Sequence, residues 1–281
     1  MKKLIAIAFL ILTSCTNYGQ IHTLTKITKK LKENSGLAIT GKDSYWVIED
    51  SGNDNAIYKL SEKGKMAREI EIENAKNVDW EELTMDDDGN VYIGDFGNNR
   101  SERKNLAIYI ISNPDKIEKK KTKAKKITFS YPEQKDFPAK DEDKIFDCEA
   151  FFYLNGQLYL FTKDRSNPYA GRCFLYTIPA TPGDYKATYL ATHNFGKDYH
   201  TGSITAADIS PDKTKVALLT HKHLYIYSDF TGSKFFEGKL TVLDLEDNSQ
   251  KESVAFKDNR TLLISDEASK KDAKLYEVTL P

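Results

Sequence analysis

Residues 81–96 read EELTMDDDGNVYIGDF, and residues 149–162 read EAFFYLNGQLYLFT. Each stretch consists of two short runs rich in apolar and aromatic residues, joined by an Asp-Gly or an Asn-Gly pair. These dipeptides are typical of the tight turn in a β-hairpin. Both stretches therefore predict two antiparallel strands, and both place a glutamate where the first strand begins.

The same pattern recurs along the chain, and two further strand-like runs follow most of the hairpins. Short strands about 8–12 residues apart, with turn signals between them, are typical of repetitive all-β folds. The first strands of the five units are expected at residues 36–40, 83–86, 150–154, 204–209 and 253–256. The last unit lacks a fourth strand, which the alternating residues 21–27 can supply. We therefore predict an all-β fold, a five-bladed β-propeller closed by an N-terminal strand.

A six-bladed ring is the main alternative, because the stretch between Leu83 and Ala150 is long enough to contain another blade. Only one set of four strand-like runs is found there. The basic run at residues 119–126 falls in its last connection and is expected to be a solvated hairpin. Five units of about 50 residues each use the whole chain after its leader. The sequence therefore favours five blades.

The N-terminus has the character of an export signal. Residues 1–14 contain two lysines, an apolar run and small polar residues, and are too short for a comfortable membrane span. The following Leu12-Thr13-Ser14-Cys15 resembles the lipobox of bacterial lipoproteins. That resemblance implies acylation of Cys15, including palmitate, and a membrane contact through this lipid anchor. It also implies a tether over residues 15–20, a propeller over 21–281, and a place in the bacterial cell envelope, with the outer membrane expected.

The charge balance limits the choice of partners. The chain has 41 Lys and Arg against 42 Asp and Glu, a net charge of -1. General nucleic-acid-binding proteins are normally strongly basic, so we expect no nucleic-acid partner. We expect a monomer.

The cysteines after the leader are expected to stay free. Cys148 and Cys173 fall on the first and third strands of one predicted blade. Such strands lie roughly 9–10 Å apart, whereas a disulfide needs Cα atoms within about 7 Å.

The residue that enters the first strand of every unit carries oxygen. Alignment of the units gives the set Ser35, Glu81, Glu149, Thr205 and Glu252. In a propeller these strands line the central channel, so the side chains should converge at one end of it. Two carboxylates 4 Å apart repel by about 4 kcal/mol at an effective dielectric near 20. Either some are protonated or they hold a cation, and an all-oxygen set suits Ca²⁺. A register shift of one residue would exchange Glu81 for Glu82, and that choice stays open.

Polar residues follow the second strand of most units and should surround the same end of the channel. Asp50 and Asp95 are the candidate catalytic residues, because each could orient a water molecule. The candidate substrate-binding residues are Arg100, Lys163, Arg165 and His221. Guanidinium and ammonium groups beside a cation commonly hold phosphate or carboxylate. The expected ligand is therefore an anionic small molecule or a surface ligand.

Several of these motifs resemble the calcium-activated nucleotidases, the soluble apyrases. The order of the five entry residues is similar to that family's Ser, Glu, Glu, Ser, Glu ring, with Thr205 in place of the second Ser. Residues 79–84 (DWEELT) resemble its Glu-Trp segment, and residues 147–150 (DCEA) its Ser-Glu-Ala segment. Residues 50–53 (DSGN) resemble its Asp-Arg-Thr-Gly turn but lack the Arg, which puts nucleotide preference in doubt. The resemblance implies a five-bladed propeller with Ca²⁺ on its axis. Gluconolactonase-like and phytase-like propellers are similar at a greater distance.

Two classes of function remain open from the sequence. The first is an envelope-anchored, Ca²⁺-dependent hydrolase of phosphoric esters or anhydrides. The second is a non-catalytic propeller in which the ion is structural and the site binds a glycan, a peptide or a partner protein. Propellers host many unrelated functions, so the fold does not decide between them.

Overall fold

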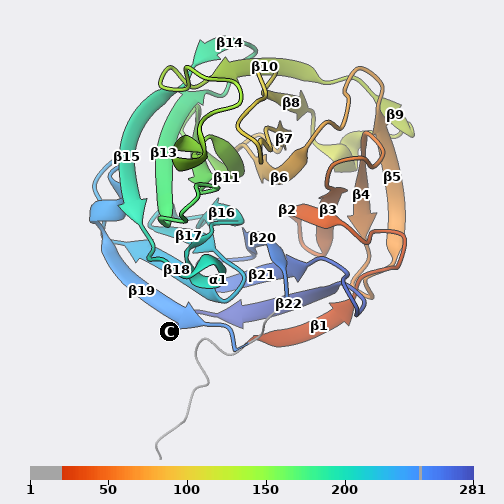
Figure 1. Cartoon of the computed structure of the whole chain (residues 1–281). Helices are drawn as coiled ribbons and strands as arrows, with labels where there is room; N and C mark the ends of the chain where they lie inside the picture. Colours follow the sequence, from red (N-terminus) through yellow and green to blue (C-terminus); the bar gives the residue numbers. More distant parts are fainter. Residues whose placement is uncertain (1–20, 247–248) are drawn as a thin grey trace, which may run out of the picture.

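The computed structural model describes residues 21–246 and 249–281, which form five β-sheets around one central axis (Figure 1). The prediction of an all-β, five-bladed propeller is confirmed, and the six-bladed alternative is wrong. The predicted signal (1–14), the tether (15–20) and Cys15 lie outside the described residues. Within the described part of the chain, no helix combines the length and the apolar character that a membrane crossing requires.

Blades 1 and 2 each have four antiparallel strands and one extra parallel strand at the outer edge. Blade 1 consists of β2 (Asn34–Gly41), β3 (Ser44–Glu49), β4 (Ala56–Leu60), β5 (Met66–Ile72) and the edge strand β9 (Lys121–Thr122). Blade 2 consists of β6 (Trp80–Met85), β7 (Val91–Asp95), β8 (Ala107–Ile111), β10 (Lys125–Ser130) and the edge strand β14 (Gly183–Lys186). Each edge strand comes from a loop of the next blade along the chain, so it ties two blades together. The repeat pattern predicted neither of them.

Blades 3 and 4 have four antiparallel strands each. Blade 3 consists of β11 (Asp147–Leu154), β12 (Gln157–Lys163), β13 (Arg172–Pro179) and β15 (Thr188–Asn194). Blade 4 consists of β16 (Ala206–Ile209), β17 (Lys215–Leu219), β18 (His223–Ser228) and β19 (Lys239–Asp244). The short helices are α1 (Tyr199–Gly202), η1 (Pro114–Lys116), η2 (Asp141–Asp143) and η3 (Phe235–Glu237).

Blade 5 joins the two ends of the described chain. It consists of β20 (Lys251–Phe256), β21 (Thr261–Asp266), β22 (Lys274–Thr279) and β1 (His22–Lys26). The N-terminal β1 pairs antiparallel with β22, with His22 opposite Glu277 and Lys26 opposite Lys274. The predicted closure of the ring by an N-terminal strand is therefore confirmed.

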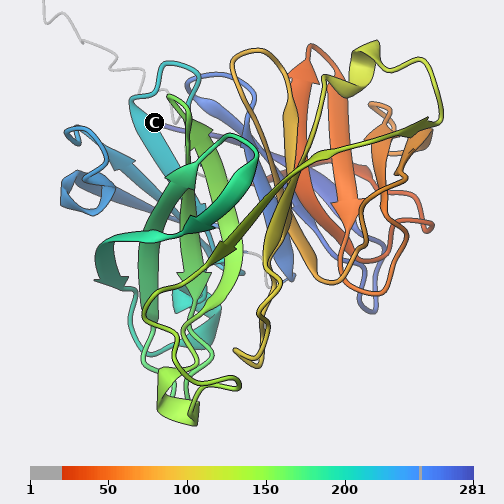
Figure 2. The same ribbon diagram turned by 90° about the horizontal axis from the view of Figure 1, so that it is seen from above.

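Figure 2 shows the sheets arranged around the axis in a second view. The apolar core is divided among the interfaces between neighbouring blades. Between blades 1 and 2, for example, the fully buried Trp46 of β3 and Trp80 of β6 belong to one cluster. Burying a large apolar side chain stabilises a fold by about 1.5–3 kcal/mol. Because each sheet packs on both faces, the inner strands are held firmly around the channel.

Side chains also connect the inner strands of neighbouring blades around the channel. A carboxylate oxygen of Glu82 in β6 accepts a hydrogen bond from Leu37 N of β2, at 3.1 Å. The Thr84 hydroxyl accepts one from Tyr153 N of β11, at 3.1 Å, and Asp208 accepts one from Phe256 N of β20, at 2.7 Å. A buried backbone N–H without a partner is costly, so these bonds stabilise the free inner edges of the sheets.

The two cysteines are buried and free, as predicted. Cys148 lies in β11 and Cys173 in β13, and β12 separates the two strands. Burial raises the pKa of both thiols, so neither is a reactive nucleophile.

Candidate functional site

A cavity of about 330 Å³ opens at one end of the central channel. All five blades or their connections contribute to it. Its lining residues are Ser35, Asp50, Glu81, Asn99, Glu149, Lys163, Arg165, Tyr199, His221, Gln250, Glu252 and Glu267. The prediction that polar side chains from every unit converge at one end of the axis is borne out for most of the predicted residues. We call this space the axial cavity.

A β-bulge turns each of three glutamates toward the axis. The pairing of β6 with β7 shifts between Trp80 and Glu82, so Glu81 has no residue directly opposite it. The pairings of β11 with β12 and of β20 with β21 shift in the same way at Glu149 and Glu252. A bulge re-aims the extra side chain against the normal alternation of the strand. The bulges thereby bring all three glutamates into the lining of the axial cavity.

The bulge in β6 also determines which of Glu81 and Glu82 faces the channel, a choice that the sequence left open. Glu81 lines the cavity, whereas Glu82 is fully buried beside the backbone of Leu37 and does not line it. In β2 the bulge falls on Gly36, which has a φ of 54°. A Cβ there would lie 2.8 Å from the backbone of β6, so only glycine fits and Ser35 borders the cavity.

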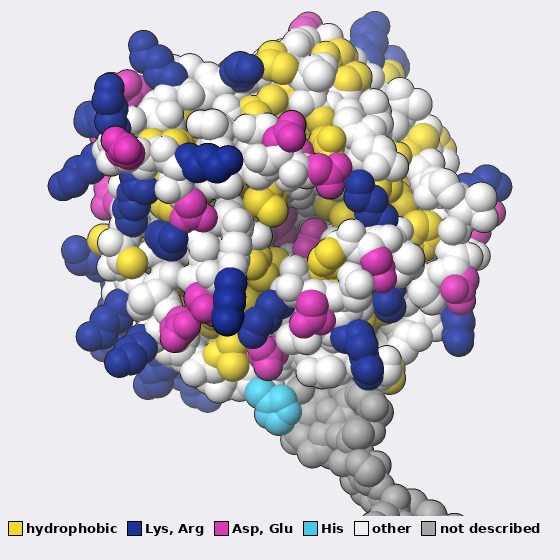
Figure 3. Space-filling view, turned by 180° about the vertical axis from the view of Figure 1, so that it is seen from behind, with side chains coloured by type: hydrophobic (Ala, Val, Ile, Leu, Met, Phe, Trp, Pro, Cys, Tyr) yellow, Lys and Arg dark blue, Asp and Glu magenta, His cyan; other side chains and the backbone are white. Residues whose placement is uncertain are grey.

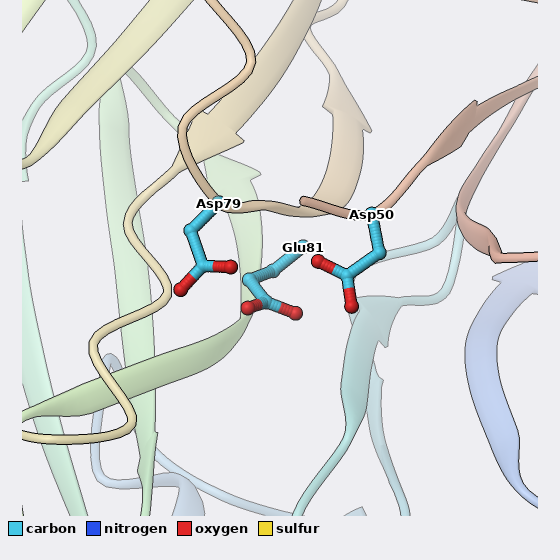
Figure 4. A group of neighbouring side chains, drawn as sticks. All are labelled: Asp50, Asp79 and Glu81. Carbon is cyan, nitrogen blue, oxygen red and sulfur yellow. The ribbon is translucent and has the colours of Figure 1, made fainter. Parts of the chain in front are cut away.

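Blades 1 and 2 contribute a group of three carboxylates that we call the acidic wall: Asp50, Asp79 and Glu81. Asp50 follows β3, Asp79 precedes β6 and Glu81 lies within β6. One oxygen of each lies within 4.8 Å of one oxygen of the other two. Figure 4 shows the three side chains pointing toward one another. Glu81 is only 6% exposed, and within the described residues its carboxylate has no hydrogen-bond or ion-pair partner.

Burial and mutual repulsion raise the pKa values of the acidic wall. The pKa of Asp50 rises to about 7, chiefly because of burial, and that of Glu81 rises well above its usual range for the same reason. Glu149 and Asp79 add repulsion. Gly97 makes the close approach possible, because a Cβ at that position would lie 2.0 Å from Glu81 Oε1 and 2.5 Å from Asp79 Oδ2.

Blade 3 contributes a group in which charges are matched, and we call it the paired wall: Asp147, Glu149, Lys163 and Arg165. Lys163 Nζ lies 3.2 Å from Glu149 Oε2, and Arg165 Nη2 lies 2.6 Å from Glu149 Oε1. Arg165 Nε lies 2.6 Å from the fully buried Asp147. The two cations outweigh burial and hold the pKa of Glu149 down, at about 2. Glu149 is therefore already neutralised by the protein.

The remaining side of the axial cavity carries partly matched groups. His221 Nε2 lies 3.7 Å from Glu252 Oε1, which is an ion pair only when the imidazole is protonated. Glu267, just after β21, accepts a hydrogen bond from Gln250 at 2.8 Å. Burial and the neighbouring Glu252 raise the pKa of Glu267 to about 8, so this carboxyl holds its proton at neutral pH.

Three predicted site residues do not line the axial cavity. Thr205 is buried in its own blade, where its backbone N–H and its hydroxyl both lie within hydrogen-bond distance of the Leu219 carbonyl. Arg100 is exposed. Asp95 is buried, pairs with Arg103 at 2.9 Å and accepts a hydrogen bond from the backbone N–H of Asp79 at 3.1 Å. Asp95 therefore positions the acidic wall rather than facing a ligand.

The sequence reading missed Asp79, Tyr199, Glu267 and the neutralising role of Lys163 and Arg165. Asp79 lies in the DWEE string that drew attention to Glu81, but only the bulge brings the two side chains together. Tyr199 lies between two blades, in α1, where an alignment of repeats has no equivalent position. Glu267 follows a second strand, as Asp50 does, and that position was the signal that could have found it.

A larger hollow of about 860 Å³ opens at the opposite end of the channel, among the tight hairpins (Figure 3). Lys213 of blade 4 reaches across it to Asp87 at 3.2 Å and to Asn155 at 3.1 Å. Both Lys213 and Asp87 are substantially exposed, and acidic and basic side chains alternate around the rim. Solvated, mixed charges of this kind give no reason to place a functional site there.

The comparisons with known proteins support the fold. No family model and no curated protein matches this sequence. The PQQ-bound aldose sugar dehydrogenase of Streptomyces coelicolor is similar in structure, with a TM-score of 0.50, 11% identity, and coverage of 92% of this chain and 98% of that one. An X-ray structure of a protein assigned as a gluconolactonase has a TM-score of 0.49 and 10% identity, covering 92% and 91%. At such low identity the likeness shows a propeller fold and no activity. The resemblances to nucleotidases and to lipoprotein signals stay predictions.

Proposed function

We propose that the acidic wall binds a divalent cation, with Ca²⁺ as the first candidate, and that the protein is a cation-dependent ester hydrolase. The observation that carries the proposal is Glu81, an almost completely buried carboxylate that lies beside Asp50 and Asp79 and has no partner among residues 21–246 and 249–281. Burying an ionised carboxylate costs several kcal/mol unless a cation or hydrogen bonds offset it. An oxygen-only group of this kind fits Ca²⁺, which accepts 6–8 oxygen ligands in flexible geometry.

This donor set differs from the ring expected from the sequence. Glu149 is matched by Lys163 and Arg165, and the Thr205 hydroxyl is directed to its own blade. The cation is therefore proposed on the side of blades 1 and 2, rather than among all five entry residues. Gly97 is consistent with this position, because the absence of a side chain there lets the carboxylates of Glu81 and Asp79 lie against the backbone and close to each other.

The proposed reaction is hydrolysis of an ester. A bound divalent cation would supply Lewis acidity, which polarises an ester oxygen and lowers the pKa of a coordinated water. The hydroxyl of the water joins the acyl or phosphoryl group while its other proton passes to the solvent, the bond to the leaving oxygen breaks, and that oxygen takes up a proton. Glu267, protonated at neutral pH, is the chain's candidate to donate that proton, and the solvent restores it.

The charge of the axial cavity narrows the substrate class. Its lining contains five carboxyl groups, and the basic groups are Lys163, Arg165 and His221. Both Lys163 and Arg165 are already paired with Glu149. A polyanion such as a nucleoside triphosphate would meet repulsion here even beside one divalent cation. We therefore favour a phosphoric diester or a carboxylic ester, which carry one negative charge or none, over the phosphoric anhydrides that the nucleotidase resemblance implies.

A non-catalytic propeller is the second candidate. The paired wall favours it, because Lys163 and Arg165 are held by Glu149 and Asp147 and are not free to receive an anion. In that case the cation would stiffen the axis, and the surrounding loops would bind a glycan, a peptide or a partner protein.

Turnover with a small panel of probes separates the two candidates. Bis(p-nitrophenyl) phosphate, p-nitrophenyl phosphate and p-nitrophenyl acetate would be offered with Ca²⁺, with Mn²⁺ and with EDTA. The hydrolase predicts turnover of the diester or the acetate that EDTA abolishes and added cation restores. Calorimetric cation binding without any turnover would favour the non-catalytic propeller, and no cation binding would remove the site itself.

We also propose that a lipid on Cys15 anchors the monomeric propeller to the cell envelope, at the outer membrane. The lipobox-like Leu12-Thr13-Ser14-Cys15 carries this proposal. Cys15→Ser should move the protein from the membrane fraction to the soluble fraction and abolish labelling by palmitate. Unchanged membrane association of this variant would contradict it.

A further inference from the structure

Tyr199 borders the axial cavity from α1, the short helix that connects blade 3 to blade 4. The carboxylate of Asp198 caps this helix by accepting hydrogen bonds from His200 N at 2.9 Å and Thr201 N at 3.1 Å. The Tyr199 ring packs against Tyr169, with ring centroids 5.5 Å apart, and against His221, at 6.1 Å. The side chain is therefore held in place before any ligand arrives.

In the part of the chain that the structure describes, the Tyr199 hydroxyl has one hydrogen bond, and its donor is a cation. Arg165 Nη1 donates to the phenol oxygen at 2.9 Å. The same guanidinium is fixed by Asp147 through Nε and by Glu149 through Nη2. Arg165 can only donate, so it does not accept the phenol proton, and no other acceptor is found within the described residues. Both Tyr199 and Arg165 line the cavity. A donor is thus available on the side formed by blades 3 and 4, away from the acidic wall.

A guanidinium that donates to a phenol oxygen makes the O–H a stronger donor. Negative charge that builds on the oxygen as its proton is shared is stabilised by the cation, and hydrogen bonds in such a chain polarise one another. A phenol is also uncharged, so it can contact a substrate oxygen without attracting a polyanion. That property matches a cavity whose lysine and arginine are already paired.

We propose that Tyr199 donates a hydrogen bond to the substrate oxygen that gains negative charge during ester hydrolysis, with Arg165 as its positioning residue. This inference rests on the proposed hydrolase function. It adds a donor opposite the acidic wall and specifies its ligand, a carboxylic ester or phosphoric diester that presents an oxygen toward blades 3 and 4. Pre-organised donors of this type typically contribute about 10²–10³-fold in kcat.

The test compares Tyr199→Phe with Tyr169→Phe. Each variant loses one hydroxyl and keeps its ring. Tyr169 packs on Tyr199, but its hydroxyl bonds to Ser203 Oγ at 3.1 Å, and Tyr169 does not line the cavity. Three readouts would be collected on the full chain: Ca²⁺ affinity by calorimetry, affinity of the Ca²⁺-loaded protein for dimethyl phosphate and for acetate, and kinetics with bis(p-nitrophenyl) phosphate and p-nitrophenyl acetate.

The proposal predicts that Tyr199→Phe leaves Ca²⁺ affinity and the melting temperature unchanged. Binding of the better oxyanion probe should weaken about 5–10-fold, the range expected for one lost hydrogen bond. The kcat of the better ester should fall about 10²-fold with little change in KM, whereas Tyr169→Phe should stay within about threefold of the unmodified protein in every readout.

Equal probe affinity in Tyr199→Phe and the unmodified protein would overturn the role of Tyr199, and so would absence of probe binding to the Ca²⁺-loaded protein. Failure of the proposed function gives a different result, because it would appear in the unmodified protein as missing Ca²⁺ binding or as missing turnover. If probe binding depends on Tyr199 but neither ester is turned over, Tyr199 remains a hydrogen-bond donor to an oxyanion and the hydrolase function is rejected.

Discussion

The acidic wall and the paired wall begin from the same local structure and end with opposite electrostatics. Glu81 and Glu149 both lie at a β-bulge of an inner strand, both line the axial cavity, and both are almost fully buried. Yet burial raises the pKa of Glu81 well above its usual range, while the pKa of Glu149 is held at about 2. The difference lies in the residues at or just after the end of the second strand, which are Lys163 and Arg165 in blade 3 and the small Gly97 in blade 2.

This contrast underlies the proposal that Glu149 is a structural carboxylate and that Glu81 binds a ligand. A buried charge that the protein already matches stabilises the ring, and removing its partner is costly. A buried charge that nothing matches costs stability until a ligand neutralises it. The protein accepts that cost at Glu81, and this is why we propose that the cation binds on the acidic wall.

Breaking the paired wall should have the largest effect. Arg165→Ala leaves Asp147 and Glu149 with too few positive partners and should lower the free energy of unfolding by about 3–5 kcal/mol. Urea unfolding would measure the loss. The control is Arg100→Ala, an exposed arginine outside the cavity, which should change stability by less than about 0.5 kcal/mol. Similar small effects for both variants would contradict the assignment of Arg165.

Adding a methyl group at Gly97, against the acidic wall, should have the next largest effect. The added Cβ of Gly97→Ala would press on Glu81 and Asp79, so we expect a loss of about 1–3 kcal/mol in stability together with weaker cation binding. Gly41→Ala is the matched control, because its nearest contact would be a side-chain atom at 4.0 Å. If Gly97→Ala binds Ca²⁺ as the unmodified protein does, the geometry proposed for the acidic wall is wrong.

Replacing a glutamate by glutamine should change the free energy of unfolding in opposite directions in the two walls. In EDTA at pH 7, Glu81→Gln removes a carboxyl group that burial forces to take up a proton on folding, and should raise the free energy of unfolding by about 1 kcal/mol. Glu149→Gln removes the carboxylate partner of Lys163, leaves Arg165 paired with Asp147 alone, and should lower it by about 3 kcal/mol. Thermal and urea unfolding of both variants would test this, and changes of the same sign would refute the contrast.

The last expected effect is spread over several pH units, in the pH dependence of stability. Burial raises the pKa of Asp50 to about 7 and that of Glu267 to about 8, so the folded state binds their protons more tightly than the unfolded state. Their stabilising contribution is complete below about pH 4 and is lost as the pH rises toward 8. In EDTA the melting temperature should therefore fall between about pH 5 and pH 8, and Ca²⁺ should reduce that fall. A melting temperature that does not change with pH, with or without Ca²⁺, would contradict the raised pKa values of Asp50 and Glu267.

The architecture could be predicted because short local sequence patterns determine its turns and strands. The Asp-Gly pair at residues 88–89 and the Asn-Gly pair at residues 155–156 mark hairpins, and the alternating residues 21–27 indicated the strand that closes the ring. Such turns and alternations depend on neighbouring residues only. The extra strands β9 and β14 depend on contacts between blades, so no local sequence pattern predicted them.

The candidate site was predictable only in outline. The alignment of repeats placed Glu81, Glu149 and Glu252 at one end of the channel, and they lie there. It could not show that Lys163 and Arg165 neutralise Glu149, or that Asp95 supports Asp79 from behind. Those relationships depend on the direction of each side chain, which the bulges and loops determine after the strands have paired.

The most direct test of the central claim is a calorimetric Ca²⁺ titration at pH 7 of the unmodified protein, Glu81→Gln and Glu252→Gln. Binding on the acidic wall predicts one site in the unmodified protein, at least about 100-fold weaker binding in Glu81→Gln, and affinity within about threefold of the unmodified value in Glu252→Gln. Equal weakening in both variants would return the cation to the five-residue axial ring. Full-strength binding in Glu81→Gln, or no binding to the unmodified protein, would contradict the account.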